Sequence, residues 1–178
     1  MEFTADWFSR HIPVWTRCVG SRAGQPLRAL EVGSYEGRSA VWFLQHLLTH
    51  PESQLTCVDR WDDGEVLRRF RSNIAETGCR ERVVERAGNS EVVLRSVSGS
   101  FDLIYIDGSH EARDVLTDAA LCWPLLHPGG VLIFDDYGWD GPVEFPPRQA
   151  IDVFLQLWMT QMEVLHKGYQ VIIRRRGD

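Results

Sequence analysis

The sequence has few cysteines, and none of them are paired in a spacing typical of disulfide frameworks or metal sites. Its four cysteines, Cys18, Cys57, Cys79 and Cys122, are widely separated and form no CxxC motif. Cys57 and Cys122 stand among apolar neighbours, as small buried core residues do. This usage argues against the disulfide framework of a small secreted protein.

Long apolar segments and a surplus of basic residues are also missing. No stretch approaches the length of a membrane-spanning helix, and the opening MEFTADWFSRH, of mixed charge, does not have the pattern of a signal peptide. A net charge of −6 argues against broad binding to nucleic acid or to anionic membranes. The one basic cluster, residues 174–176, is interpreted as the solvated end of a strand. We therefore expect a cytoplasmic protein with neither a nucleic-acid nor a membrane partner.

The 178 residues contain no repeat, low-complexity tract or linker that would divide them. A chain of this length suits one domain with a substantial core. We expect a single domain over residues 1–178, with an N-terminal helical segment at 1–27 and a core at 28–176. The segment TADWFSRHIPVWTRCVG predicts a helix that is interrupted near Pro13.

Short apolar runs alternate with longer segments of helical periodicity. Apolar residues recur three or four positions apart in three stripes, at 40–48, 115–126 and 151–162. Strands without polar alternation, separated by helices, indicate an α/β doubly wound, mostly parallel sheet with helices on both faces. The five strand-like runs lie at 28–33, 54–61, 82–88, 101–108 and 130–136.

The final segment, MEVLHKGYQVIIRR at 162–175, departs from this rhythm. Its two extended runs flank Lys167 and Gly168, which is typical of a tight hairpin. The hairpin predicts that the last strand runs antiparallel to an otherwise parallel sheet.

Ligands of such sheets bind at the carboxyl ends of the strands, so the residues after each strand are the informative ones. After the first strand, Gly33 and Gly37 allow a tight turn and a close approach of a ligand to the backbone. The loop lacks the GxGxxG spacing of a dinucleotide site, and Glu31 would repel a pyrophosphate but suit an amine. An NAD-dependent oxidoreductase is therefore disfavoured, although a plain strand–helix turn explains this loop equally well.

Polar residues follow the second and third strands as well. Asp59 can accept hydrogen bonds from both hydroxyls of a ribose, and the nearby Trp61 can cover a purine. Alternatively Asp59 caps the next helix, although Asp62 and Asp63 are better placed for that. In AGNSEVV, Ser90 is an N-cap, or its neighbourhood contacts an adenine edge, and the two interpretations are compatible.

Acids gather after the fourth and fifth strands. Asp107 opens the segment DGSH, and Asp135 and Asp136 follow the run VLIF. Three carboxylates at neighbouring strand ends offer a hard oxygen site, which suits Mg²⁺ better than zinc. Two alternatives stay open: Asp136 only caps a turn while Asp135 faces the metal or cofactor, or both acids are held by Arg113 or Arg148.

His110 closes the DGSH segment and also has two interpretations. It is either a general base that takes a hydroxyl proton, or a residue that orients the Asp107 loop or caps the next helix.

Taken in order, the segments EVGSYEGRS, VDRW, GNS, FDLIYIDGSH and HPGGVLIFDDY, with the terminal hairpin, resemble the class I S-adenosylmethionine-dependent methyltransferases. The resemblance covers about residues 28–175 and is strongest to small O-methyltransferases with divalent-metal sites, of the catechol and macrolide-sugar types. It implies a Rossmann-like sheet of seven strands, the last of them antiparallel. It also implies S-adenosyl-L-methionine as cofactor and Mg²⁺ or another divalent cation.

The resemblance also implies roles for individual residues. Glu31 and Gly33 would hold the methionine part of the cofactor, Asp59 its ribose and Ser90 its adenine edge. Asp107 would serve both cofactor and metal, and with His110 it would be catalytic. The metal ligands would be Asp107, Asp135 and Asp136. Further cofactor contacts are expected from the same loops, at Ser34, Gly37, Arg60, Trp61 and Asn89.

The function predicted is methyl transfer to a hydroxyl of a small-molecule or sugar-like acceptor, assisted by a divalent metal. The alternatives are a metal-independent methyltransferase with His110 as general base, and a non-catalytic module that binds S-adenosylmethionine. The loop at 137–149 either brings Tyr137 and Trp139 to the acceptor or packs Trp139 underneath. Because only about 27 residues precede the first strand, the acceptor pocket is expected to be open or to be completed in a homodimer.

Overall fold

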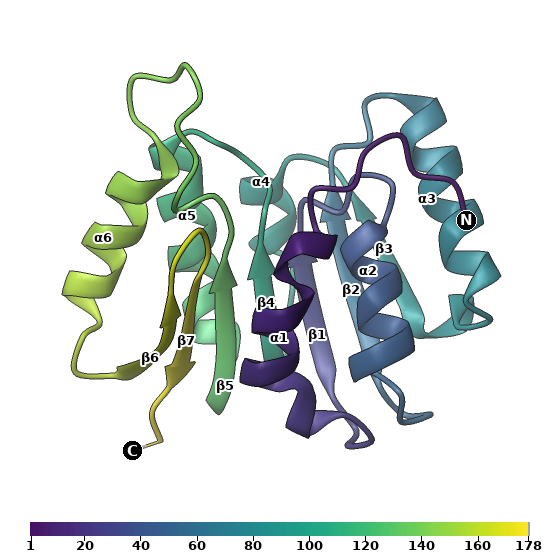
Figure 1. The fold of residues 1–178 in the computed structure, drawn as a ribbon, viewed down its shortest axis with the longest axis horizontal. Coiled ribbons are helices and arrows are strands. Elements are labelled where there is room, and N and C mark those ends of the chain that lie inside the picture. The colour runs from purple at the N-terminus through teal and green to yellow at the C-terminus, as the bar shows by residue number, and fades with distance from the viewer. Residues whose placement is uncertain (178) are drawn as a thin grey trace.

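A seven-stranded sheet forms the centre of the computed structural model, which describes residues 1–177 (Figure 1). The strand order is β3-β2-β1-β4-β5-β7-β6, with β1 to β5 parallel and β7 antiparallel to both of its neighbours. The predicted fold class, including the antiparallel last strand, is confirmed. The strands are β1 (Arg28–Val32), β2 (Gln54–Asp59), β3 (Val83–Ala87), β4 (Phe101–Ile106), β5 (Leu126–Phe134), β6 (Met162–Lys167) and β7 (Val171–Arg175).

Helices cover both faces of the sheet (Figure 1). Successive residues of a strand face opposite sides, so in β4 Leu103 and Tyr105 pack with α1 to α3, whereas Ile104 and Ile106 pack with α4 to α6. No helix within residues 1–177 is long and apolar enough to cross a membrane. The helices are α1 (Ile12–Val19), α2 (Arg38–Trp42), α3 (Gly64–Glu76), α4 (Ser90–Leu94), α5 (Ala112–Cys122) and α6 (Pro147–Leu157).

The prediction that Pro13 interrupts a helix is wrong. Pro13 lies in the first turn of α1. Backbone N–H groups of the first turn have no acceptor within the helix, so the lack of an N–H in proline breaks no helical hydrogen bond there. Proline therefore marks the start of this helix, and a short 3-10 turn (Ser9–His11) precedes it.

Two apolar stripes extend beyond their helices. The third stripe was expected to reach Met162, but α6 ends at Leu157 and Met162 begins β6. The second stripe includes Leu126, which begins β5. The apolar spacing continues past each helix because Leu126 and Met162 pack in the same core cluster as the helix that precedes them. A π-helical turn (Phe43–Leu47) also continues α2, and the spacing of its apolar residues does not distinguish it from α-helix.

The N-terminal segment crosses the upper edge of the molecule from α3 to α1 (Figure 1). The backbone N–H and the hydroxyl of Thr4 donate to the Glu36 carboxylate at 2.6 and 2.8 Å. Glu36 is buried and also accepts from Arg69 at 3.0 Å, while the Asn73 side chain bonds the backbone of Glu2. These bonds hold residues 2–4 against the loop that follows β1 and against α3.

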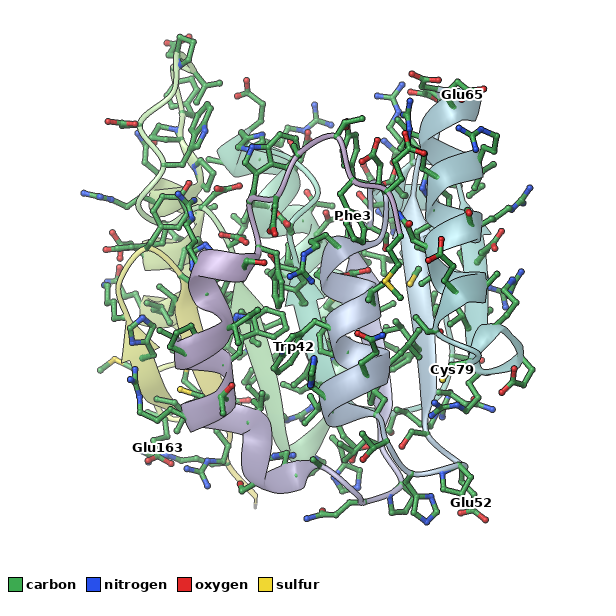
Figure 2. All side chains as sticks on the ribbon, turned by 45° about the vertical axis from the view of Figure 1, so that its right-hand side comes forward. Phe3, Trp42, Glu52, Glu65, Cys79 and Glu163 are labelled. Atoms are coloured by element: carbon green, nitrogen blue, oxygen red, sulfur yellow. The ribbon has the colours of Figure 1, made fainter. Side chains whose placement is uncertain are left out.

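An aromatic cluster joins α1 to the rest of this face. The ring of Trp15 meets Phe8, Trp42 and Tyr105 edge-on, with centroid distances of 4.8, 5.5 and 4.8 Å. Figure 2 shows Trp42 between α1 and α2. Edge-to-face pairs of this kind stabilise a core beyond the apolar area they bury, so α1 is packed firmly against the sheet.

The first strand carries a completely buried carboxyl group, that of Glu31. Ser34 and Ser39 donate to its two oxygens at 2.6 and 2.5 Å, and the Cys57 thiol lies 3.6 Å away. Burial raises the pKa of Glu31 to about 7, against its usual 4.5, because desolvation outweighs the serine hydrogen bonds. Glu31 thereby ties the start of α2 to β1.

This raised pKa predicts how stability depends on pH. Folding favours the neutral form of Glu31. The contribution of this group to the free energy of unfolding is therefore fully present below about pH 4.5 and is lost as the pH rises through about 7. Glu31→Gln keeps the shape without the charge. The variant should therefore gain stability relative to wild type between pH 5 and 8, by at most roughly 3 kcal/mol. Urea unfolding of both proteins at the two pH values measures this gain, and an unchanged difference would contradict it.

Candidate active site

Two cavities lie along the carboxyl edge of the parallel strands. They have volumes of about 230 and 470 Å3 and share three lining residues, Gly33, Asp59 and Gly108. The smaller is lined by the loops after β2 and β3 and by α5. The larger is lined by the N-terminal segment, the loops after β4 and β5, and the β6–β7 turn.

Gly33 lies where these loops come closest. Its φ is +88°, and a Cβ at this position would lie 2.0 Å from the carbonyl oxygen of Asp107. Only glycine therefore allows the β1 loop to pack against the β4 loop. Gly37, with φ +83°, starts α2 but lines neither cavity.

Several predicted cofactor residues shape the loops instead of lining a cavity. Glu31 and Ser34 are buried together beneath the β1 loop. Direct contact of Glu31, Ser34 or Gly37 with a ligand stays a prediction. The indole N–H of Trp61 donates to the Tyr35 carbonyl at 2.9 Å, and its ring packs against Phe70 with 4.7 Å between ring centroids. Trp61 lines neither cavity, and its contact with a purine stays a prediction.

Asp59 lines both cavities. Its carboxylate accepts the backbone N–H groups of Tyr35 and Trp61 at 2.8 and 2.9 Å. These two donors fix the side chain at the boundary between the cavities. Arg60 lines the smaller cavity and pairs with Asp62 at 2.6 Å, while Asp63 caps α3.

Asn89 and Ser90, which follow β3, line the smaller cavity. The N-cap of α4 is Asn89, so the interpretation of Ser90 as N-cap is wrong by one residue.

Sequence reasoning missed Asp118, which is 2% exposed and faces the same cavity from α5. Burial raises its pKa to about 6. The available signal was an acid next to Ala119 in the apolar stripe of α5.

Asp107, Asp135 and Asp136 come together at the ends of β4 and β5. Each offers one carboxylate oxygen, and these oxygens lie within 4.8 Å of one another. Burial raises the pKa of Asp107 and of Asp135, and repulsion between the neighbouring carboxylates raises both further. All three residues line the larger cavity.

Tyr105 lies directly beneath this cluster. Its hydroxyl oxygen is 2.8 Å from Oδ2 of Asp107 and is also hydrogen-bonded to Oδ2 of Asp135. A phenol has one proton and can donate to only one of these oxygens. The second contact therefore requires a proton on a carboxyl group or a cation shared between the acids.

Two other contacts hold the acid pair. The Tyr169 hydroxyl donates to Oδ1 of Asp136 at 3.0 Å, and Gln170 donates to Asp135 at 2.9 Å. Arg148 instead donates to the carbonyl of Tyr137 at 3.2 Å. In the part of the chain that the structure describes, no arginine or lysine pairs with either acid, so the interpretation that Arg113 or Arg148 holds them is wrong.

His110 stands at the rim of the larger cavity. Its Nε2 lies 3.1 Å from Oδ2 of Asp136, and this contact raises the pKa of the imidazole. The ring lies against Trp139, with 4.5 Å between centroids. Trp139 lines the cavity, whereas the Tyr137 hydroxyl is directed to Asp152 at 3.0 Å. Of the two aromatic residues of this loop, Trp139 lines the cavity, and its contact with an acceptor stays a prediction.

The N-terminal segment supplies a wall that sequence reasoning missed. Trp7 and Arg10 line the larger cavity. The rings of Trp7 and Tyr35 have 5.4 Å between their centroids, and the guanidinium carbon of Arg10 lies 4.1 Å from the ring centroid of Tyr169. The segment thus covers the site more than its length suggested.

Comparison with known proteins supports the resemblance found in the sequence. A family model described as a methyltransferase domain matches residues 30–137, more than half of the chain. The O-methyltransferase hkm8 of Aspergillus hancockii is 30% identical over 114 residues, 64% of this chain and 44% of that protein. The uncharacterized protein R132 of Acanthamoeba polyphaga mimivirus is 22% identical over 135 residues, 73% of this chain and 60% of that protein. The chain thus spans about half the length of these curated relatives.

Solved structures share the fold at low sequence identity. The O-methyltransferase TomG of Streptomyces achromogenes, in complex with SAM, superposes with a TM-score of 0.75 at 19% identity, over 97% of this chain and 82% of that one. An O-methyltransferase of Bacillus cereus, in complex with SAH, gives 0.77 at 19% identity, over 98% and 84%. With this strand order and the match over residues 30–137, the chain belongs to the methyltransferase-domain family, within class I of the S-adenosylmethionine-dependent methyltransferases.

Proposed function

We propose that this domain transfers the methyl group of S-adenosylmethionine to a hydroxyl oxygen of a small-molecule or sugar-like acceptor, assisted by a divalent cation. The observation that carries the proposal is the cluster of Asp107, Asp135 and Asp136, which lines the larger cavity next to Gly33 and Asp59. The methyl donor and the cation would thus meet at the same carboxyl edge of the sheet.

The two cavities suit the two ends of the donor. Asp59, at their boundary, is an acceptor suited to ribose hydroxyls, and Asn89, Ser90 and Asp118 supply polar groups for an adenine in the smaller cavity. The methionine part and the acceptor would then share the larger cavity, near Gly33. This assignment leaves the acids on the acceptor side.

The residues present fit a magnesium or manganese ion. Three carboxylates provide hard oxygen ligands. The carboxylates repel one another, and Tyr105 has only one proton to donate to them, so a bound cation would compensate the remaining negative charge. When bound, such a cation acts as a Lewis acid that lowers the pKa of a nearby hydroxyl. Zinc fits less well because no cysteine lies among the ligands.

The side chains around the cluster would orient the acceptor and remove its proton. His110, held by Asp136, is placed at the rim to accept a hydroxyl proton. Trp7 and Trp139 line the cavity and would shield the reacting oxygen from water. Methyl transfer needs little beyond such positioning, because the sulfonium is already a good leaving group.

A metal-independent transferase is the second candidate. The contact between His110 and Asp136 favours it, because a histidine oriented by a carboxylate can serve as a base without a cation. A non-catalytic module that binds S-adenosylmethionine is the third. A small-molecule acceptor, a homodimer and a cytoplasmic location stay predictions.

The metal is tested by chelation. With a panel of phenols and sugars as acceptors, we expect EDTA to abolish conversion of S-adenosylmethionine to S-adenosylhomocysteine, and Mg²⁺ or Mn²⁺ to restore it. Asp107→Asn should lower kcat about 100-fold or more, because one charged oxygen ligand is lost. The matched control is Asp140→Asn, which changes an exposed acid in the loop after β5. Turnover unaffected by EDTA would favour His110 alone, and no turnover in wild type would favour the binding module.

Cofactor binding is tested at Asp59. In Asp59→Asn one carboxylate oxygen becomes an NH2 group, which cannot accept from the Tyr35 or Trp61 amide or from a ribose hydroxyl. We expect the affinity for S-adenosylhomocysteine, measured by isothermal titration calorimetry, to fall about 10- to 100-fold. Asp62→Asn, on the same loop but 69% exposed, should bind like wild type. Equal affinities for both variants would remove Asp59 from the cofactor site.

A further inference from the structure

Two consecutive residues in the turn of the β6–β7 hairpin hold the two consecutive acids that follow β5. Tyr169 donates to Asp136, and the side-chain amide of Gln170 donates to Oδ2 of Asp135 at 2.9 Å. The partners are 33 and 35 positions apart in the chain. The terminal hairpin therefore does more than complete the sheet, because its turn reaches the acid cluster.

The orientation of the Gln170 amide is fixed by the chemistry of Trp15. The indole N–H of Trp15, which can only donate, lies 2.7 Å from Oε1 of Gln170. The amide oxygen must therefore face Trp15, and the NH2 group must face Asp135. Trp15 is completely buried and Gln170 is 1% exposed, so the bond between them is shielded from water.

Asp135 is held from three directions as a result. Its Oδ2 accepts from Gln170 and bonds Tyr105, and its Oδ1 accepts the backbone N–H of Asp136 at 2.7 Å. A carboxylate has about four lone-pair sites, so about one is left for a further partner. Trp15 also packs edge-on against the ring of Tyr105. Trp15 of α1 therefore contacts both side-chain partners of Asp135, Gln170 and Tyr105.

We propose that Gln170, oriented by Trp15, is the positioning residue that holds Asp135 in place as a ligand for a divalent cation. The inference rests on the proposed metal-assisted function. Gln170 itself lines neither cavity, so it acts through Asp135 and does not touch cofactor or acceptor. It links the first helix and the last hairpin to the acids between them.

The test compares metal and cofactor binding in Gln170→Met. Methionine is close to glutamine in size but has neither the amide donor nor the carbonyl acceptor. We expect calorimetry to show Mn²⁺ binding weakened about 10- to 100-fold, the usual effect of removing a partner of a metal ligand. The Kd for S-adenosylhomocysteine should stay within about twofold, because the cofactor loops are untouched. Gln156→Met, on the exposed side of α6, should leave both affinities unchanged.

A second variant tests the same chain of hydrogen bonds from its other end. Trp15→Phe removes the indole N–H and keeps an aromatic ring, so it should also weaken Mn²⁺ binding. Because Trp15 orients Asp135 through Gln170, the double variant should bind Mn²⁺ about as well as Gln170→Met alone. Additive losses would show that the two residues act separately and would overturn the assignment.

Three other results decide the inference. Wild-type Mn²⁺ affinity in Gln170→Met would overturn it, and so would an equal loss of Mn²⁺ and S-adenosylhomocysteine affinity, which would indicate general damage. If wild type binds no Mn²⁺, the metal part of the proposed function is wrong. Crystal structures of wild type and Gln170→Met then decide the positioning role: Asp135 turned away from Tyr105 in the variant supports it, and an unchanged Asp135 overturns it.

Discussion

The hydroxyl of Tyr105, placed between the carboxyl groups of Asp107 and Asp135, is the interaction on which the site depends. Three acids at the ends of β4 and β5 repel one another and lose hydration on burial. One phenol proton cannot satisfy both of its acidic neighbours. The arrangement calls for a proton or a cation shared among the acids, and in the proposed function that cation would also assist methyl transfer.

The rest of the chain keeps this unfavourable cluster in place. Gly33 lets the β1 loop pack against the backbone of Asp107, and the hairpin turn reaches the acid pair through Tyr169 and Gln170. Trp15 then connects that turn to the first helix. Segments from both ends of the chain thus converge on two acids in its second half.

The sequence predicts the sheet well because its apolar runs are short, uniform and separated by helical periods. It also predicts that Asp59, Asp107 and the pair Asp135–Asp136 line one edge, since parallel strands place their carboxyl ends together. It could not show the roles of Trp15 and Gln170. Those depend on contacts across 155 positions, and in the sequence alone Trp15 is an ordinary apolar residue of a helix.

The mistaken predictions have physical causes of the same kind. One alternative was that Arg113 or Arg148 holds both acids, but Arg148 donates to the carbonyl of Tyr137. Tyrosine, glutamine and histidine fill that place instead, and they leave the net negative charge that a cation requires.

The most direct measurement is a crystal structure of the protein with S-adenosylhomocysteine and Mn²⁺, with anomalous data collected to locate the metal. The account predicts an anomalous peak between Asp107, Asp135 and Asp136, and the nucleoside in the smaller cavity. A well-bound cofactor with only water among the three acids, or with Mn²⁺ bound elsewhere, would contradict it.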